Sequence, residues 1–186
     1  STLSNPTQFN SKTSMAASTG NTTYFIPIRA CAVNTDIYII GYNSDSDVYH
    51  LKYDTINDSY TNLNATGLLY NGLKPKETPL VYYANCLYAV HGWQGYRIVM
   101  KYDISNDSGG WSIIWNETET SSTGGANSVT DKYVTAHIHY GNCVYIFGGR
   151  DLPYQTNTYY DDLWKYDIAN NTWTLITNAT GSPPPP

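Results

Sequence analysis

Residues 143–177 read CVYIFGGRDLPYQTNTYYDDLWKYDIANNTWTLIT. The stretch opens on an apolar run that ends at the pair Gly148-Gly149, and a polar loop follows. Two further strand-like runs come next, at 163–168 and 173–176, with an Asn-Asn turn between them. Apolar runs divided by Gly and Asn are typical of antiparallel strands joined by turns. The stretch therefore predicts a β-meander.

The same order of features occurs three times along the chain. A tyrosine in an apolar run recurs at spacings of 50 and 57 residues. A strand-like run precedes each of these tyrosines, at 29–33, 79–83 and 135–140. Downstream, each unit has a run that ends in Tyr-Asp, and an aromatic residue then begins a fourth run. In chain order these markers are Tyr38, Tyr53-Asp54 and Tyr60, then Tyr88, Tyr102-Asp103 and Trp111, then Tyr145, Tyr166-Asp167 and Trp173.

This pattern resembles the kelch repeat in its Tyr-Asp and its following aromatic, and in the paired glycines, which only the third unit keeps. Four strands in a period near 50 residues are typical of that repeat. The resemblance implies an all-β fold of antiparallel four-stranded blades, stacked face to face as in a β-propeller. Three kelch-like units are expected, at 29–78, 79–134 and 135–180, between a Ser/Thr-rich segment 1–28 and a proline-rich tail or linker 181–186.

Three units are too few for a closed ring, because propellers close with about four to eight blades. The sequence therefore predicts an incomplete or open propeller of about three blades. Residues 7–15 precede an Ala-Ser-Thr-Gly sequence like those that follow each fourth run, which makes them a candidate last strand of an incomplete blade. The chain is then a piece of a longer propeller, an open stack, or a subunit that completes its blades with a neighbour's strands.

Length, net charge and the lengths of the apolar runs argue against several classes of function. The 186 residues are long enough for one domain with a sizeable core. A net charge of −5, without a basic run, argues against a nucleic-acid partner. No apolar stretch approaches the roughly 20 residues of a membrane span. The start at Ser1, without an initiator Met or a signal-like segment, suggests a processed product or a fragment.

Seven Asn-x-Ser/Thr sequons are candidate N-glycosylation sites. In each unit one lies three residues after the Tyr-Asp aspartate, in a predicted turn, and a second follows the fourth run. Glycans there would coat the exterior, which predicts a secreted or cell-surface protein. The alternative is that these turns favour Asn for its tolerance of left-handed backbone, with Ser or Thr following by accident. The sequons are Asn57, Asn106 and Asn170 in the turns, Asn64, Asn116 and Asn178 after the fourth runs, and Asn21.

Three cysteines, Cys31, Cys86 and Cys143, make an odd count. Cys86 and Cys143 occupy the same place in neighbouring units, which favours a separation beyond the roughly 7 Å between Cα atoms that a disulfide allows. One bridge with a leftover thiol, an intermolecular bridge and three buried thiols all remain open.

Metal chemistry has weak sequence support. His137 and His139 would lie on one face of a strand, but no third ligand accompanies them. The carboxylates of Asp161-Asp162, and those of Asp45 and Asp47, are expected in loops, where solvated charge or weak calcium binding are the alternatives. No phosphate-binding Gly-rich loop, Cys-x-x-Cys or Gly-x-Ser-x-Gly is present, so we expect neither catalysis nor a cofactor.

These observations favour a non-enzymatic, N-glycosylated extracellular structural protein that self-associates into a fibre or surface coat through its unfinished blade ends. The expected partners are other copies of the chain or further blades, and the four closing prolines would form a stiff spacer. A recognition module for proteins or glycans is the alternative, with Trp93, Tyr96 and Tyr154 as contacts. The kelch resemblance also admits a fragment of a copper oxidase similar to galactose oxidase.

Overall fold

The computed structural model describes residues 25–43, 47–68, 78–90, 98–116, 136–150 and 159–177. Within these ranges the chain forms twelve strands and one short 3₁₀ helix, η1 (Asp107–Gly109). The strands are β1 (Phe25–Val33), β2 (Asp36–Asn43), β3 (Val48–Asp54), β4 (Ser59–Leu63), β5 (Leu80–Tyr83), β6 (Cys86–Val90), β7 (Ile98–Asp103), β8 (Trp111–Asn116), β9 (Ala136–Tyr140), β10 (Cys143–Arg150), β11 (Tyr159–Asp167) and β12 (Thr172–Thr177).

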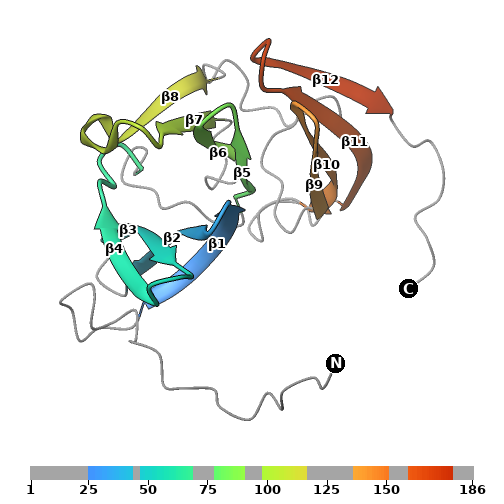
Figure 1. Cartoon of the computed structure of the whole chain (residues 1–186). Helices are drawn as coiled ribbons and strands as arrows, with labels where there is room; N and C mark the ends of the chain where they lie inside the picture. The colour runs from blue at the N-terminus through green and yellow to red at the C-terminus, as the bar shows by residue number, and fades with distance from the viewer. Residues whose placement is uncertain are drawn as a thin grey trace, which may run out of the picture.

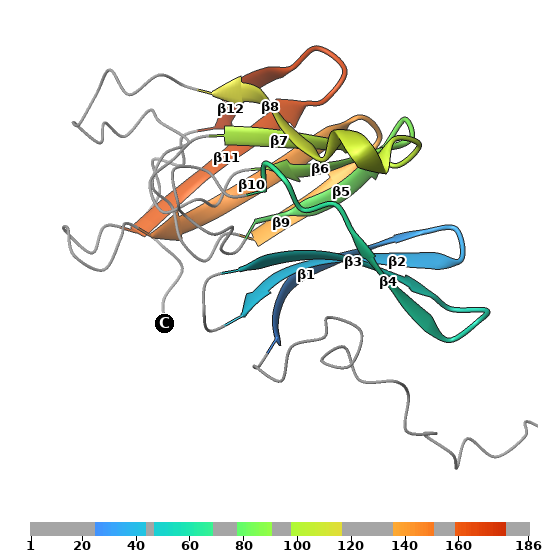
Figure 2. The ribbon, with the colours of Figure 1, turned by 90° about the vertical axis from the view of Figure 1, so that its left-hand side faces the viewer.

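The strands form three antiparallel sheets of four, each in sequence order. We call them the first sheet (β1–β4), the second sheet (β5–β8) and the third sheet (β9–β12). Figure 1 shows them one after another along an arc, with β4, β8 and β12 on its outside, and Figure 2 shows the same stack from the side. The all-β prediction of three four-stranded, kelch-like blades in an open propeller is therefore confirmed.

Two strands begin earlier than the sequence indicates. β1 starts at Phe25, inside the segment 1–28, and β11 starts at Tyr159 rather than at Leu163. β11 is longer because β10 continues past the glycine pair, so that Arg150 pairs with Tyr159. The expectation that a polar loop reaches residue 162 is wrong for this reason. The candidate strand at 7–15 lies outside the described residues.

The glycine pair of β10 forms a bulge. Gly148 and Gly149 have φ angles of 62° and 113°, a backbone region that glycine adopts without steric cost. The register between β10 and β11 shifts at this point. A Cβ atom on Gly148 would lie 2.9 Å from the carbonyl oxygen of Tyr160. Gly148 thus lets two backbones approach closely where β11 begins.

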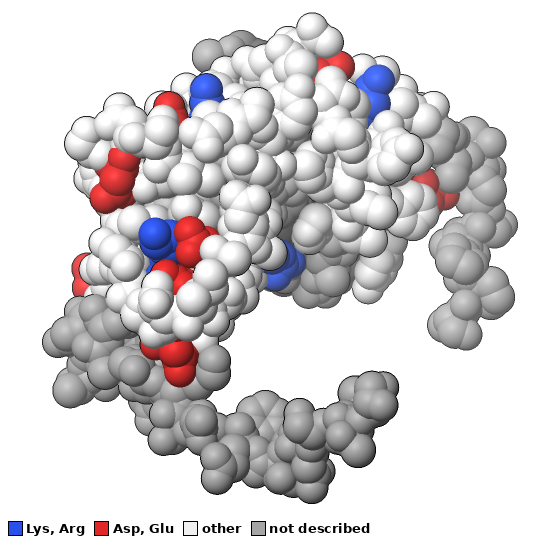
Figure 3. Space-filling model, in the orientation of Figure 1, with Lys and Arg blue, Asp and Glu red and all other residues white. Residues whose placement is uncertain are grey.

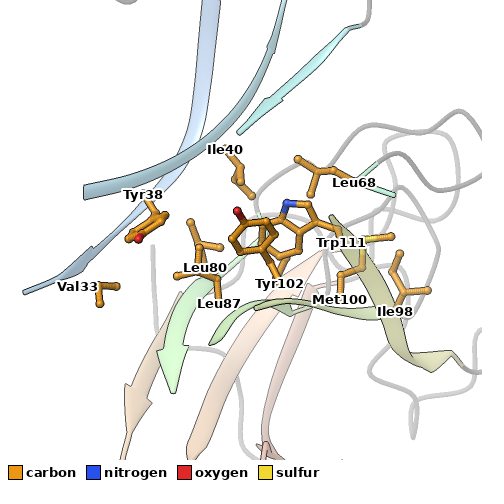
Figure 4. Close-up of a cluster of buried hydrophobic side chains, with 11 residues drawn as sticks. Val33, Tyr38, Ile40, Leu68, Leu80, Leu87, Ile98, Met100, Tyr102 and Trp111 are labelled. Atoms are coloured by element: carbon orange, nitrogen blue, oxygen red, sulfur yellow. The ribbon is translucent and has the colours of Figure 1, made fainter. Parts of the chain in front are cut away.

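The sheets bury their faces against one another. We call the side of each sheet that carries its second-strand tyrosine the front face, and the opposite side the back face. Tyr38 and Ile40, on the front face of the first sheet, share a core with Leu87 and Tyr102 on the back face of the second (Figure 4). A second core joins the front face of the second sheet to the back face of the third, and contains Tyr88, Val90, Val99, Val144, Ile146 and Tyr166.

One polar side chain lies inside the first of these cores. His50 of β3 is fully buried, and its ring packs edge-on against Tyr102 at 4.4 Å and Trp111 at 5.2 Å between centroids. Neither ring nitrogen has a hydrogen-bond partner. Burial lowers the pKa of His50 from 6.5 to about 4, because a charged imidazole there would lose its hydration. His50 therefore fills the core as a neutral ring.

We expect acid to destabilise the contact between the first and second sheets through His50. The unfolded chain binds a proton at His50 as the pH falls below 6.5, whereas the folded chain binds it only near pH 4. The free energy of unfolding should therefore fall by up to about 3 kcal/mol across this window, relative to His50→Leu. Urea unfolding at several pH values measures the difference. Equal pH dependence of the two proteins would contradict the expectation.

The Gly148 bulge gives a second prediction. Gly148→Ala should destabilise the chain by at least about 1 kcal/mol more than Gly141→Ala, because only the former places a methyl group against a backbone carbonyl. Gly141 is a matched control, since its φ of 63° is nearly the same and a Cβ there has no neighbour within 4 Å. Urea unfolding at neutral pH gives both values, and equal losses would show that the close approach at Gly148 can relax.

Candidate functional site

The front face of the third sheet carries exposed apolar side chains. Tyr145 and Phe147 in β10 occupy the places that Tyr88 and Val90 hold in β6. Val90 is fully buried against the third sheet, whereas Phe147 is 52% exposed. The face that each preceding sheet buries against its successor thus remains open here.

Neighbouring strands extend this apolar surface. The register of β9 against β10 pairs Ile138 with Tyr145, and Tyr140 with Cys143, so both side chains belong to the front face. They are 63% and 77% exposed. Ile176 of β12 and Tyr159 of β11 add exposed apolar area to the same sheet. A group of exposed apolar side chains on one sheet marks a candidate interaction site.

The opposite end of the stack differs. On the back face of the first sheet Leu51 is fully buried, and Ile39 and Tyr53 are each 9% exposed. None of the three belongs to either core between the sheets. Of the two blade ends expected to be unfinished, only the front face of the third sheet presents a group of exposed large apolar residues within the described ranges.

A hydrogen bond that the sequence analysis missed recurs in every sheet. The hydroxyl of the Tyr-Asp tyrosine donates to the side chain five residues later: Tyr53 to Asp58 at 2.6 Å, Tyr102 to Asp107 at 2.5 Å, and Tyr166 to Asn171 at 2.6 Å. Each tyrosine also packs against the aromatic residue at the first or second position of the fourth strand. The sequence feature that could have predicted this bond is an Asp or Asn five residues after each Tyr-Asp tyrosine.

The same acceptor positions connect successive sheets. The Asp107 carboxylate accepts the backbone N–H of Asn64, which follows β4. The Asn171 amide donates to the carbonyl of Ile114 in β8. A backbone bond from the N–H of Trp111 to the carbonyl of Thr66 closes the first junction. The second and third sheets are therefore each hydrogen-bonded to the outer strand of the preceding sheet or to the residues directly after it.

The turn sequons lie where their spacing places them. Asn57, Asn106 and Asn170 are exposed and stand between the third and fourth strands of their sheets. The backbone N–H and side-chain amide of Asn57 both donate to Asp54, which holds the pKa of Asp54 below its ordinary value. Asn170 makes the same two bonds to its Tyr-Asp aspartate. In the first and third of these turns Asn therefore has a structural role, whether or not it carries a glycan.

The second set of sequons is less uniform. Asn64 is half-buried at the junction of the first two sheets, and its amide donates to the carbonyl of Ser108 at 3.2 Å. Asn116 is the last residue of β8. Asn21 and Asn178 lie outside the described residues.

All three cysteines are free thiols. Cys31 is half-buried beside the first core, and its burial raises the pKa of the thiol. Cys86 and Cys143 begin β6 and β10 and are buried. A single chain therefore contains three thiols, of which two are buried and one is half-buried.

The candidate metal residues do not converge. His137 and His139 lie on one side of β9, as expected, and pair in register with Ile146 and Val144. The described part of the chain brings no three His, Cys, Asp or Glu side chains together. The prediction that Asp161 and Asp162 are loop carboxylates is wrong, because β11 includes both.

Asp162 has a structural partner in the strand that contains it. It is 4% exposed and accepts the indole N–H of Trp164 at 2.7 Å. Asp47 is exposed just before β3, and Asp45 lies outside the described residues. The proposed recognition residues Trp93, Tyr96 and Tyr154 lie outside them as well.

Charge is sparse on the surface. Figure 3 shows only a few Lys, Arg, Asp and Glu side chains on the face in view, most of which is uncharged. In the described ranges no helix has the length and apolar character needed to cross a membrane. Apolar contact between sheets is thus the recognition chemistry that the described surface offers most clearly.

Comparison with known proteins agrees with this architecture. The kelch-motif family model matches residues 135–180, which contain the whole third sheet. No curated protein matches the chain. The first and second sheets repeat the strand order of the matched unit, its Tyr-Asp and its hydrogen bond to the residue five positions on. The third sheet is a kelch motif by sequence, and all three sheets fit kelch-like blades.

Proposed function

We propose that this chain is a non-catalytic extracellular structural protein that self-associates through the front face of its third sheet and carries N-linked glycans on its turns. Copies associated through this face would be the units from which further contacts build a fibre or surface coat. The kelch motif indicates a protein-interaction module in general terms. The exposed apolar face supports self-association as the specific form of that role.

The observation that carries the proposal is the exposure of Phe147. In the second sheet the corresponding residue, Val90, is fully buried by the sheet that follows. A sheet with two apolar faces is stable when both are covered, as in repeat proteins whose units bury their faces against neighbours. Leaving Phe147, Ile138 and Tyr140 in water forgoes that stabilisation, roughly 25 cal/mol for each Å² of apolar surface. Association with another sheet recovers it.

The glycan part of the proposal rests on the exposed turn sequons. Asn57, Asn106 and Asn170 occupy the same turn in all three sheets, so glycans there would line one end of the stack. Asn57 and Asn106 belong to the turns of the other two sheets, whereas Asn170 follows β11 of the third sheet and bonds to Asp167, which the register places on the front face. Glycans at Asn57 and Asn106 are therefore compatible with association through that face.

A recognition module for a different protein is the second candidate, and the kelch-motif match favours it. In that case the same front face, or the loops around it, would bind a partner rather than a second copy. The two candidates differ in whether the pure protein associates with itself.

Sedimentation velocity of the purified chain from about 1 to 100 μM tests self-association. We expect the weight-average mass to rise with concentration toward a multiple of 20.8 kDa, because apolar faces are buried by mass action. Moderate salt should change the association little, since the contact is apolar. A constant mass of one chain over this range would contradict self-association and favour the recognition module.

Intact-mass spectrometry of the chain secreted from a eukaryotic host tests glycosylation. We expect a mass above that of the polypeptide that falls after enzymatic removal of N-glycans, with occupied sites at Asn57, Asn106 and Asn170. Substituting Ser59, Ser108 and Thr172 by Ala removes these three sequons and should abolish that part of the shift. An unmodified mass in the secreted protein would contradict the glycan proposal.

A further inference from the structure

The exposed face of the third sheet has a specific arrangement of self-association available to it. We propose that two copies pair through this face, front face against front face, to form a closed two-fold symmetric dimer. This inference rests on the proposed self-association and names the partner and the surfaces that meet. A fibre or coat would then be built from such pairs by other contacts.

Continuity with the existing interfaces identifies the occupant as a β-sheet. The front faces of the first and second sheets are each covered by a four-stranded sheet, through the second-strand tyrosine and the apolar residue two positions later. Tyr145 and Phe147 repeat these two positions in the third sheet. An apolar sheet of similar width therefore matches this face better than a helix or a polar loop.

The exposure pattern decides which sheet of the second copy meets it. A head-to-tail contact would use the back face of the first sheet, but Leu51 there is fully buried and Ile39 is 9% exposed within a single chain. The front face of the third sheet, in contrast, exposes Ile138, Tyr140 and Phe147 by 63%, 77% and 52%. In a symmetric contact the same open patch serves both copies.

The apolar area of the face suits such a pair. An aromatic side chain buries about 150–250 Å², so two of these faces together can remove on the order of 1,000 Å² from water, where specific interfaces begin. Lys165 and Asp167 lie on the front face beside Tyr145 and Cys143. The Asp167 carboxylate already accepts hydrogen bonds from the Asn142 amide and from the backbone N–H and amide of Asn170, so the contact between copies rests on the apolar area.

Four single substitutions test the arrangement by sedimentation equilibrium. Phe147→Lys and Ile138→Lys place a charge on the face and should each raise the dimer Kd at least about 30-fold. Ile56→Lys is the matched control, since Ile56 is 73% exposed but lies in the turn after β3. Asn62→Lys tests the head-to-tail contact, because Asn62 is exposed and pairs with Leu51 on the back face of the first sheet. Both controls should leave Kd within about threefold of the wild type.

A mixing experiment tests the symmetry. Phe147→Lys and Phe147→Asp should each be monomeric alone, whereas an equimolar mixture should form dimers that contain one copy of each, because the apposed faces then carry opposite charges. Head-to-tail pairing would not show this rescue, since residue 147 of either variant would meet the unchanged first sheet. Thermal unfolding of each variant establishes that it is folded, and Ile138→Lys provides an independent test should a Phe147 variant unfold.

The outcomes separate the pairing from the function. A wild-type dimer, weakened by the two front-face substitutions and rescued by mixing, supports the inference. Dimers or larger species that Asn62→Lys weakens and Phe147→Lys does not, or the absence of mixed dimers, overturn the symmetric pairing and leave self-association standing. A wild-type chain that is monomeric at every concentration overturns both.

Discussion

Burial of sheet faces against other sheets is the constraint on which this structure depends. A four-stranded sheet with apolar residues on both sides cannot cover either side by itself. The second sheet has both faces covered: Leu87 and Ala89 face the first sheet, and Tyr88 and Val90 face the third. The outer sheets each have one face inside the stack; of their other faces, the front face of the third sheet is exposed at Phe147, whereas the back face of the first is buried at Leu51. The difference in exposure between Leu51 and Phe147 shows that these two faces are not equivalent.

Polar contacts determine how the sheets fit at their outer edges. The buried hydroxyls of Tyr102 and Tyr166 would lose hydrogen bonds to water, and the side chain five residues on replaces them. Asp107 and Asn171 then bond to the backbone of the preceding sheet, at Asn64 and Ile114. One short turn thereby satisfies a buried tyrosine and aligns two sheets. His50 has no comparable partner, so its neutrality is what the first core requires.

The strand pattern could be predicted well because it depends on local chemistry. Alternating apolar residues, glycine at the end of β10 and Asn in the turns each act over a few residues, and the twelve strands follow them closely. The extension of β11 to Tyr159 was missed because the polar residues Asp161 and Asp162 resemble a loop. The carboxylate of Asp162 is tolerated in a strand because Trp164 donates its indole N–H to it, a contact that no periodicity reveals.

Repetition in the sequence is sufficient to identify three similar four-stranded units, too few to close a ring. Those conclusions follow from repetition, which residues such as Tyr38, Tyr88 and Tyr145 display directly. Which apolar residues are buried could be learned only from the packing of the sheets in three dimensions. Tyr88 and Tyr145 occupy the same place in their units, yet the face around Tyr88 is buried and the face around Tyr145 is not. Burial depends on which sheets are neighbours in space, and that is a property of the assembled stack rather than of any one repeat.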